Sequence, residues 1–64
     1  MVESSKIKRT REKLGLSQEK LARIADVSNN TIINIEAGKQ QNPTIETLKK
    51  IARALNVPIK DLIK

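Results

Sequence analysis

Apolar residues recur at helical spacing along most of the chain, and glycine, proline and capping residues divide this pattern into short segments. The first segment is a helix predicted from Ser5 to Leu14, with apolar side chains on one side and Arg11 between them. Gly15 is expected to end this helix because glycine accepts a positive φ without steric cost. Residues 1–4 lie ahead of the pattern, and we expect them to be a frayed tail.

Two closely spaced helices are predicted next. Ser17 caps the first of them, and Asp26 and Val27 form the turn, where aspartate tolerates a left-handed backbone better than most residues. Ser28 caps the following helix, which continues to about Ala37. Helices joined this tightly can hold the second one away from the body of the protein, where it fits a DNA major groove.

The remaining segments are a polar loop over 39–43 and two further helices. Thr44 caps the fourth helix, Asn56 ends it as a left-handed cap, and Pro58 opens a short fifth helix. The sequence therefore predicts an all-α fold, a compact five-helix arrangement in a single domain of residues 1–64. The expected core is aliphatic: Ile7, Leu14, Leu16, Leu21, Ala22, Ala25, Val27, Ile32, Ile35, Ile45, Leu48, Ile51, Ala52, Leu55 and Leu62.

Composition narrows the possible functions. The 64 residues include 13 basic and seven acidic ones, for a net charge of +6, which favours a polyanionic partner over basic helix faces that only meet solvent. The chain has no Cys, His or aromatic residue, so we predict no catalytic residue, no metal site and no cofactor, and no stacking on single-stranded bases. No apolar run is long enough for a membrane span or a signal peptide, so we expect a soluble, cytoplasmic protein. If the chain binds DNA, we expect it to be nucleoid-associated.

Three segments, LSQEKLA, VSNNTIINIEAGK and NPTIETLKKIARALNV, resemble the Cro/repressor-type helix-turn-helix domains of the xenobiotic-response-element family. The resemblance covers about residues 7–62. It departs from the family at Asp26 and Asn56, where glycine is common, but both residues tolerate a positive φ. The resemblance implies a lambda-repressor-like fold with a helix-turn-helix motif at about 17–37 and a recognition helix at 28–37.

Four residues on the outward side of the recognition helix are the predicted base contacts: Asn29, Asn30, Ile33 and Asn34. An asparagine amide both donates and accepts, so it can pair bidentately with the N6 and N7 edge of adenine. Ile33 could pack on a thymine methyl group. We therefore expect a half-site richer in A·T than in G·C; the alternative is a solvated polar helix face.

Backbone contacts are expected around this helix. The resemblance implies that Gln18 binds a phosphate at the amino terminus of its helix, although first-turn packing without a ligand is the alternative. Ser28 is expected to act first as a cap and then, with Thr31, to reach the DNA backbone. The loop that follows the recognition helix tracks the backbone in relatives and here contains Lys39, Gln40 and Gln41. Lys39 is the strongest candidate, against the alternative of a solvated loop lysine.

Arg11 and Glu36 are a separate, structural prediction. The resemblance implies an ion pair between them that ties the first helix to the third. A partly buried guanidinium needs a carboxylate, so the loss of either partner would destabilise the fold. The alternative is two exposed charges.

A homodimer is expected because one recognition helix spans too few base pairs for useful specificity. The predicted dimer surface is apolar and lies near the carboxyl end: Val57, Pro58, Ile59 and Ile63. The alternative is that these residues are ordinary core.

The sequence favours a double-stranded-DNA-binding transcriptional regulator, most simply a repressor, with no small-molecule effector site evident. A second class is an antitoxin or a coactivator-type interaction module that uses the same fold. An enzyme is the weakest reading, since the chain lacks a phosphate-binding glycine loop and paired acids as well as His and Cys.

Overall fold

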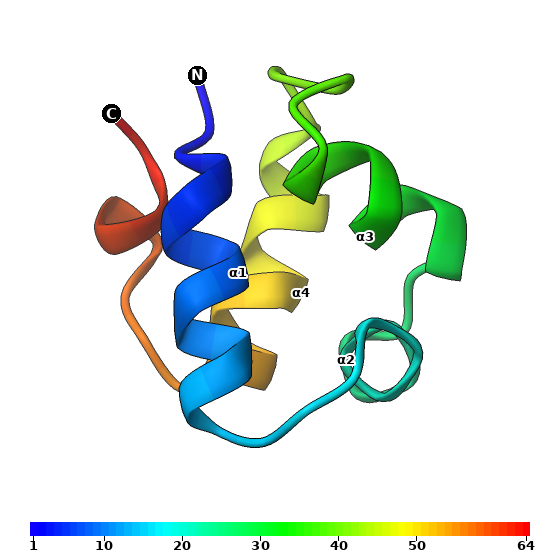
Figure 1. Ribbon diagram of the computed structural model, residues 1–64. Helices are drawn as coiled ribbons and strands as arrows, with labels where there is room; N and C mark the ends of the chain where they lie inside the picture. The colour runs from blue at the N-terminus through cyan, green and yellow to red at the C-terminus, as the bar shows by residue number, and fades with distance from the viewer.

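The computed structural model describes residues 1–64 and contains four α-helices followed by one turn of 3₁₀-helix (Figure 1). In chain order these are α1 (Ser4–Lys13), α2 (Gln18–Ala25), α3 (Asn29–Glu36), α4 (Ile45–Leu55) and η1 (Ile59–Leu62).

The predicted count of five helices is therefore wrong in its last member. After Pro58 the chain forms 3₁₀-helix rather than α-helix, and the i+3 bond from the Asp61 N–H to the Pro58 carbonyl, at 3.0 Å, marks its start. Ile63 then becomes extended, with φ −116° and ψ 142°, because it pairs with Val2 in an isolated antiparallel bridge. That pairing prevents the turn from continuing as an α-helix.

The hydroxyl side chains of Ser17, Ser28 and Thr44 cap α2, α3 and α4, as the sequence predicts. The Oγ atom of Ser17 accepts the Lys20 N–H at 3.0 Å at the start of α2, and Thr44 accepts the Thr47 N–H at 3.1 Å at the start of α4. These bonds satisfy backbone donors that have no partner within the helix.

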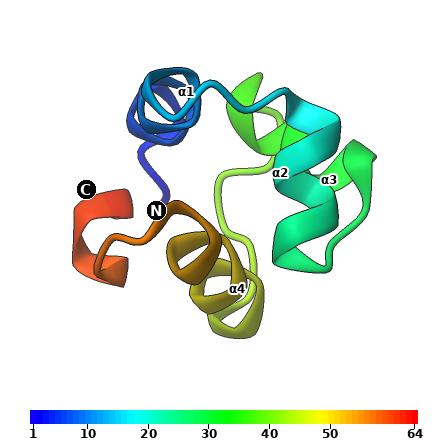
Figure 2. The same ribbon diagram turned by 90° about the horizontal axis from the view of Figure 1, so that it is seen from below.

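The elements close a ring around one core, as the view along α1 shows (Figure 2). α1 packs against α3, α3 against α2, and α2 against α4. η1 completes the ring by packing against both α4 and α1. None of the helices combines the length and the apolarity that a bilayer crossing requires.

The core contains twelve buried apolar residues, most of them predicted: Val2, Ile7, Leu21, Ala22, Ala25, Ile32, Ile35, Leu48, Ile51, Ala52, Leu55 and Leu62. Leu14 and Ile45 were expected there, but they are 52% and 59% exposed. Both lie at helix ends, Leu14 as the carboxyl cap of α1 and Ile45 as the first residue of α4, and their side chains stay outside the ring of packed helices. Leu16 and Val27 are only partly buried against the core.

The amino terminus is also different from its prediction, because residues 1–4 are not a frayed tail. Val2 is buried to 3% exposure, and its N–H donates to the Gln41 carbonyl at 2.9 Å. The Glu3 N–H donates to the Leu62 carbonyl at 2.7 Å, and the Lys64 N–H donates to the Met1 carbonyl at 3.1 Å. The two ends of the chain thus make a strand-like contact that is too short to be recognised in the sequence.

Candidate nucleic-acid interface

Helix α3 has two chemically distinct sides. Ile32 and Ile35 are fully buried and fix the helix on the core. Asn29 and Asn30 are exposed at the start of the helix, and Ile33 is 37% exposed on the next turn. Asn34 is half-buried. The structure thus gathers the predicted base-contact residues on the side that faces away from the core.

The amides on this side have no partner within the protein. None of the side-chain hydrogen bonds in the structure involves Asn29, Asn30 or Asn34. Each amide therefore retains both its donor and its acceptor for a ligand. This is the arrangement that bidentate pairing with a base edge requires.

The turn between α2 and α3 is tight and held by local bonds. Asp26 has φ 59° and ψ 46°, in the left-handed region, and the Val27 N–H returns to the Ala22 carbonyl at 3.0 Å. The Oγ atom of Ser28 accepts the Thr31 N–H at 3.1 Å and lies 2.7 Å from the Thr31 hydroxyl oxygen. Ser28 therefore acts as the cap of α3, and its hydroxyl is paired with that of Thr31 in the free protein.

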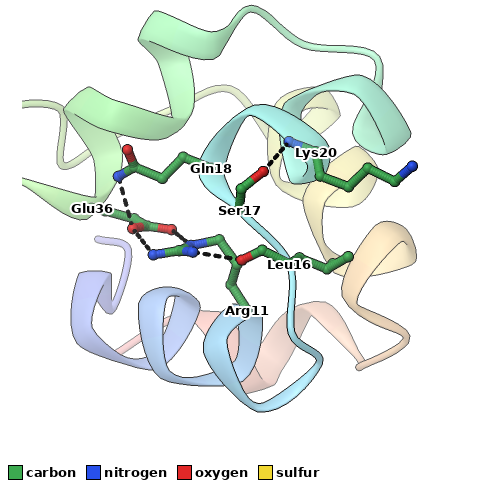
Figure 3. A network of polar contacts seen from close by, with 6 residues as sticks. All are labelled: Arg11, Leu16, Ser17, Gln18, Lys20 and Glu36. Carbon is green, nitrogen blue, oxygen red and sulfur yellow. Dashed lines mark hydrogen bonds and ion pairs between the residues drawn. The ribbon is translucent and has the colours of Figure 1, made fainter.

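A polar network joins α1, the start of α2 and the last residue of α3, at the ends of α2 and α3 that lie away from this turn (Figure 3). Arg11 is 9% exposed, and its Nε donates to Glu36 Oε2 at 2.7 Å while its second terminal nitrogen donates to Oε1 at 3.1 Å. Its other terminal nitrogen donates to the Leu16 carbonyl at 2.6 Å. The Glu36 side chain is 3% exposed. Two charges this well buried and paired bidentately hold the far end of α3 against α1.

The pKa of Arg11 is raised above its ordinary value, chiefly by the hydrogen bond that it donates to Glu36. Burial acts in the opposite direction, and the negative charges of Glu36 and Glu12 add to the increase. The Arg11 guanidinium therefore stays positively charged at and well above neutral pH.

Gln18 joins the same network, which sequence reasoning did not predict. Its Nε2 donates to Glu36 Oε1 at 3.1 Å, so one carboxylate oxygen accepts from both Arg11 and Gln18 (Figure 3). Because a carboxylate offers only acceptors, this contact fixes which end of the amide faces Glu36. The second N–H of Gln18 remains available at the amino terminus of α2.

The loop after α3 presents its side chains to solvent. Lys39, Gln40 and Gln41 are all exposed. The backbone N–H groups of Lys39 and Gln40 both donate to the Asn34 carbonyl, at 2.9 and 3.2 Å. Gly38 makes this wrapping possible with a φ of +78°. The loop therefore begins directly beside the last turn of α3.

The residues of the predicted dimer surface lie apart from α3, around η1. Pro58 is exposed, whereas Val57, Ile59 and Ile63 are half-buried and pack in part against the core. The structure thus gives these three side chains some internal packing and leaves part of each accessible.

Comparison with known proteins connects this geometry with a family. The helix-turn-helix family matches residues 7–62, which is most of the chain. An uncharacterised HTH-type transcriptional regulator of Archaeoglobus fulgidus is 41% identical over 58 residues, which cover 91% of this chain and 81% of that protein. The cryptic phage CTXphi transcriptional repressor RstR of Vibrio cholerae is 40% identical over 60 residues, or 94% of this chain and 53% of the repressor.

Two solved structures have the same fold over nearly the whole chain. The restriction-modification controller protein C.AhdI of Aeromonas hydrophila superposes with a TM-score of 0.88 at 27% identity, covering 94% of this chain and 89% of its own. The biofilm master regulator SinR, solved in complex with DNA, also has a TM-score of 0.88, at 32% identity, and the match covers 92% and 97% of the two chains.

Proposed function

This chain belongs to the Cro/C1-type helix-turn-helix family, and on that basis we propose that it is a transcription regulator that binds double-stranded DNA with α3 in the major groove. The observation that carries the proposal is the set of unpaired asparagine amides on the outward side of α3. The inward side of this helix is held by the buried Ile32 and Ile35 and by the ion pair of Glu36 with Arg11. The net charge of +6 favours the approach to a polyanion. A protein with this function would be associated with the chromosomal DNA.

Repression is the simplest form of this activity. Residues 1–64 offer no evident effector site, so regulation would follow from the occupation of a promoter. A relative named as a transcriptional repressor supports this choice. The interaction-module alternative is not favoured, because the relatives and neighbours are named as regulators or controllers.

Base readout by Asn29, Asn30 and Asn34 predicts an operator half-site rich in A·T. Selection from randomised duplexes, followed by footprinting, identifies the site. Replacement of all three by alanine should then abolish discrimination against random duplex, since each bidentate pair contributes about 1–3 kcal/mol. Lys49→Ala, on an exposed part of α4, is the control and should keep the selected sequence.

Two outcomes would contradict this assignment. A folded triple variant that protects the same base pairs with undiminished preference would show that α3 does not read the bases. A consensus dominated by G·C would leave DNA binding intact but overturn the pairing of asparagine with adenine.

Phosphate contacts are proposed for Lys39, with Gln40 and Gln41 beside it, and for Gln18 at the start of α2. Lys39→Ala should weaken binding about equally for all sequences and lower the slope of log Kd against log salt by roughly one. A loss of preference at a single base position would instead place Lys39 in a groove.

We further propose that the active form is a homodimer through the surface of Val57, Pro58, Ile59 and Ile63. Pro58→Glu, at an exposed position, should reduce the dimer fraction in sedimentation equilibrium and weaken binding to the full operator more than to a half-site. Val57→Lys provides a second variant at a half-buried position. If both variants remain dimeric, the two copies meet elsewhere.

A further inference from the structure

The first residues connect two segments that are distant in the chain, the loop after α3 and the carboxyl-terminal segment. Met1 and Glu3 pair with Lys64 and Leu62 through backbone hydrogen bonds of 3.1 and 2.7 Å. Between them, Val2 buries its side chain in the core and directs its N–H to the Gln41 carbonyl at 2.9 Å. A buried side chain thus fixes the donor that holds the loop.

The loop has few other restraints. Its beginning is held by the two hydrogen bonds to the Asn34 carbonyl, and its end is held by Pro43, which is buried. Between these points the Gln41 side chain donates to the Gly38 carbonyl at 3.4 Å, which is a bond within the loop itself. The backbone bond from Val2 is therefore the one that ties the middle of the loop to the body of the protein.

We propose that Val2 is a positioning residue for DNA binding, which sets the loop of residues 38–42 so that Lys39 faces a phosphate. This rests on the proposed function. If an interface loop is already ordered in the free protein, binding does not include the entropy cost of ordering it, and the affinity is higher. The Val2 side chain is buried in the core and has no contact with DNA in this assignment.

Val2→Pro tests the proposal because proline lacks the N–H but keeps an apolar side chain. At a temperature at which the variant is fully folded, its affinity for the selected duplex should fall about threefold to tenfold. The slope of log Kd against log salt should fall by up to roughly one, as for Lys39→Ala, while the preferred sequence stays the same. Ile51→Val, in the middle of α4, is the control that weakens the core but should leave the salt slope unchanged.

A double variant separates positioning from stability. In the Lys39→Ala background, Val2→Pro should reduce affinity by less than twofold, because the contact that it positions is already absent. An equal loss in both backgrounds, or an unchanged salt slope in Val2→Pro, would overturn the proposal. If Val2→Pro does not fold, Val2→Ala is the second variant. It keeps the N–H donor but removes most of the buried side chain that holds the donor in place, so it should show a smaller decrease in affinity and in salt slope. An affinity and a slope equal to those of the parent would count against the proposal.

Failure of the proposed function would be visible without any change at Val2. A parent protein with no affinity for duplex DNA, or a Lys39→Ala variant with the parent salt slope, would remove the contact that Val2 is proposed to position. A different combination is that the parent binds duplex DNA and Lys39→Ala lowers the salt slope as expected, while the affinity losses of Val2→Pro and Lys39→Ala are additive. That combination would overturn only the positioning role of Val2.

Discussion

Two helix ends in this protein have similar sequences and the same backbone, yet they lead into segments with different proposed roles. Residues 21–28 are LARIADVS and residues 51–58 are IARALNVP. Asp26 ends α2 with φ 59° and ψ 46°, and Asn56 ends α4 with φ 59° and ψ 43°. One end leads into the proposed recognition helix, and the other leads into the proposed dimer surface.

The hydrogen bonds of the two ends are also equivalent. Val27 donates to the Ala22 carbonyl and Val57 to the Ala52 carbonyl, each at 3.0 Å. Both valines pack in part against the core. A left-handed cap, a bond that spans six residues and an apolar residue after the cap are the elements of a Schellman motif. The local sequence is therefore sufficient to set the geometry of both turns.

The difference begins at the next residue. The Ser28 side chain caps a helix of eight residues, and Glu36 then fastens the far end of that helix to Arg11. Pro58 makes no side-chain cap, and only four residues of 3₁₀-helix follow before the chain becomes extended. The same turn can thus precede either a rigid polar surface or a short apolar one, and the residues after it decide which.

The largest expected effect comes from removing the ion pair between Arg11 and Glu36, which holds the carboxyl end of α3. The segment after Asn56 has no such ion pair. Arg11→Ala and Glu36→Ala should each reduce the free energy of unfolding by about 3–5 kcal/mol, because each leaves a buried charge without its partner. Urea unfolding measures this loss. A double replacement by apolar residues, Arg11→Met with Glu36→Leu, should recover most of it. Unchanged unfolding midpoints in both single variants would contradict a structural role for the pair.

The pH dependence of this contribution follows from the raised pKa of Arg11. A cation whose pKa is higher in the folded state adds stability below its unfolded pKa, and that stability is lost only as the pH rises through the folded value. Because both values for arginine lie in the strongly alkaline range, the Arg11 contribution should be constant between about pH 6 and about pH 9. A loss that grows across this interval would point to another group.

A moderate effect is expected at the two left-handed caps. Asp26→Ala and Asn56→Ala should each reduce the free energy of unfolding by about 1 kcal/mol, since alanine is disfavoured at a φ of 59°. Asp26→Gly and Asn56→Gly remove that steric penalty and serve as the controls. Equal losses at the two positions would confirm that the turns are energetically as well as geometrically alike. Clearly unequal losses would mean that the segment after each turn contributes to its strain.

The left-handed caps and most of the core were predictable because they depend on local spacing and residue type. Asp26 and Asn56 are among the few residues that tolerate that conformation, and Ile32 and Ile35 follow helical periodicity. Val2 was not predictable, because its burial depends on a bridge to Ile63, sixty-one residues later in the chain. Local spacing indicates which side of a helix is apolar, but it does not show where the neighbouring elements end.

The same distinction applies to the candidate interface. The outward side of α3 follows from periodicity once the inward isoleucines are known. The contact between Gln18 and Glu36 joins residues from different helices, and no spacing rule connects them. Their meeting depends on the angle at which α2 and α3 pack, and that angle is a property of the assembled core.

The smallest expected effect tests whether the one chemical difference within the two turns matters. Asp26 is charged where Asn56 is neutral, and Lys50 Nζ lies 3.9 Å from Asp26 Oδ2. The Asp26 side chain is 95% exposed, so solvent screens this pair and its contribution should be slight. Asp26→Asn should therefore change the free energy of unfolding by less than about 0.5 kcal/mol, and Lys50→Ala should do the same. A larger loss of unfolding free energy in Asp26→Asn that disappears in the Lys50→Ala background would show that the charge of Asp26 helps to hold its turn. The turns at Asp26 and Asn56 would then have the same geometry for different reasons.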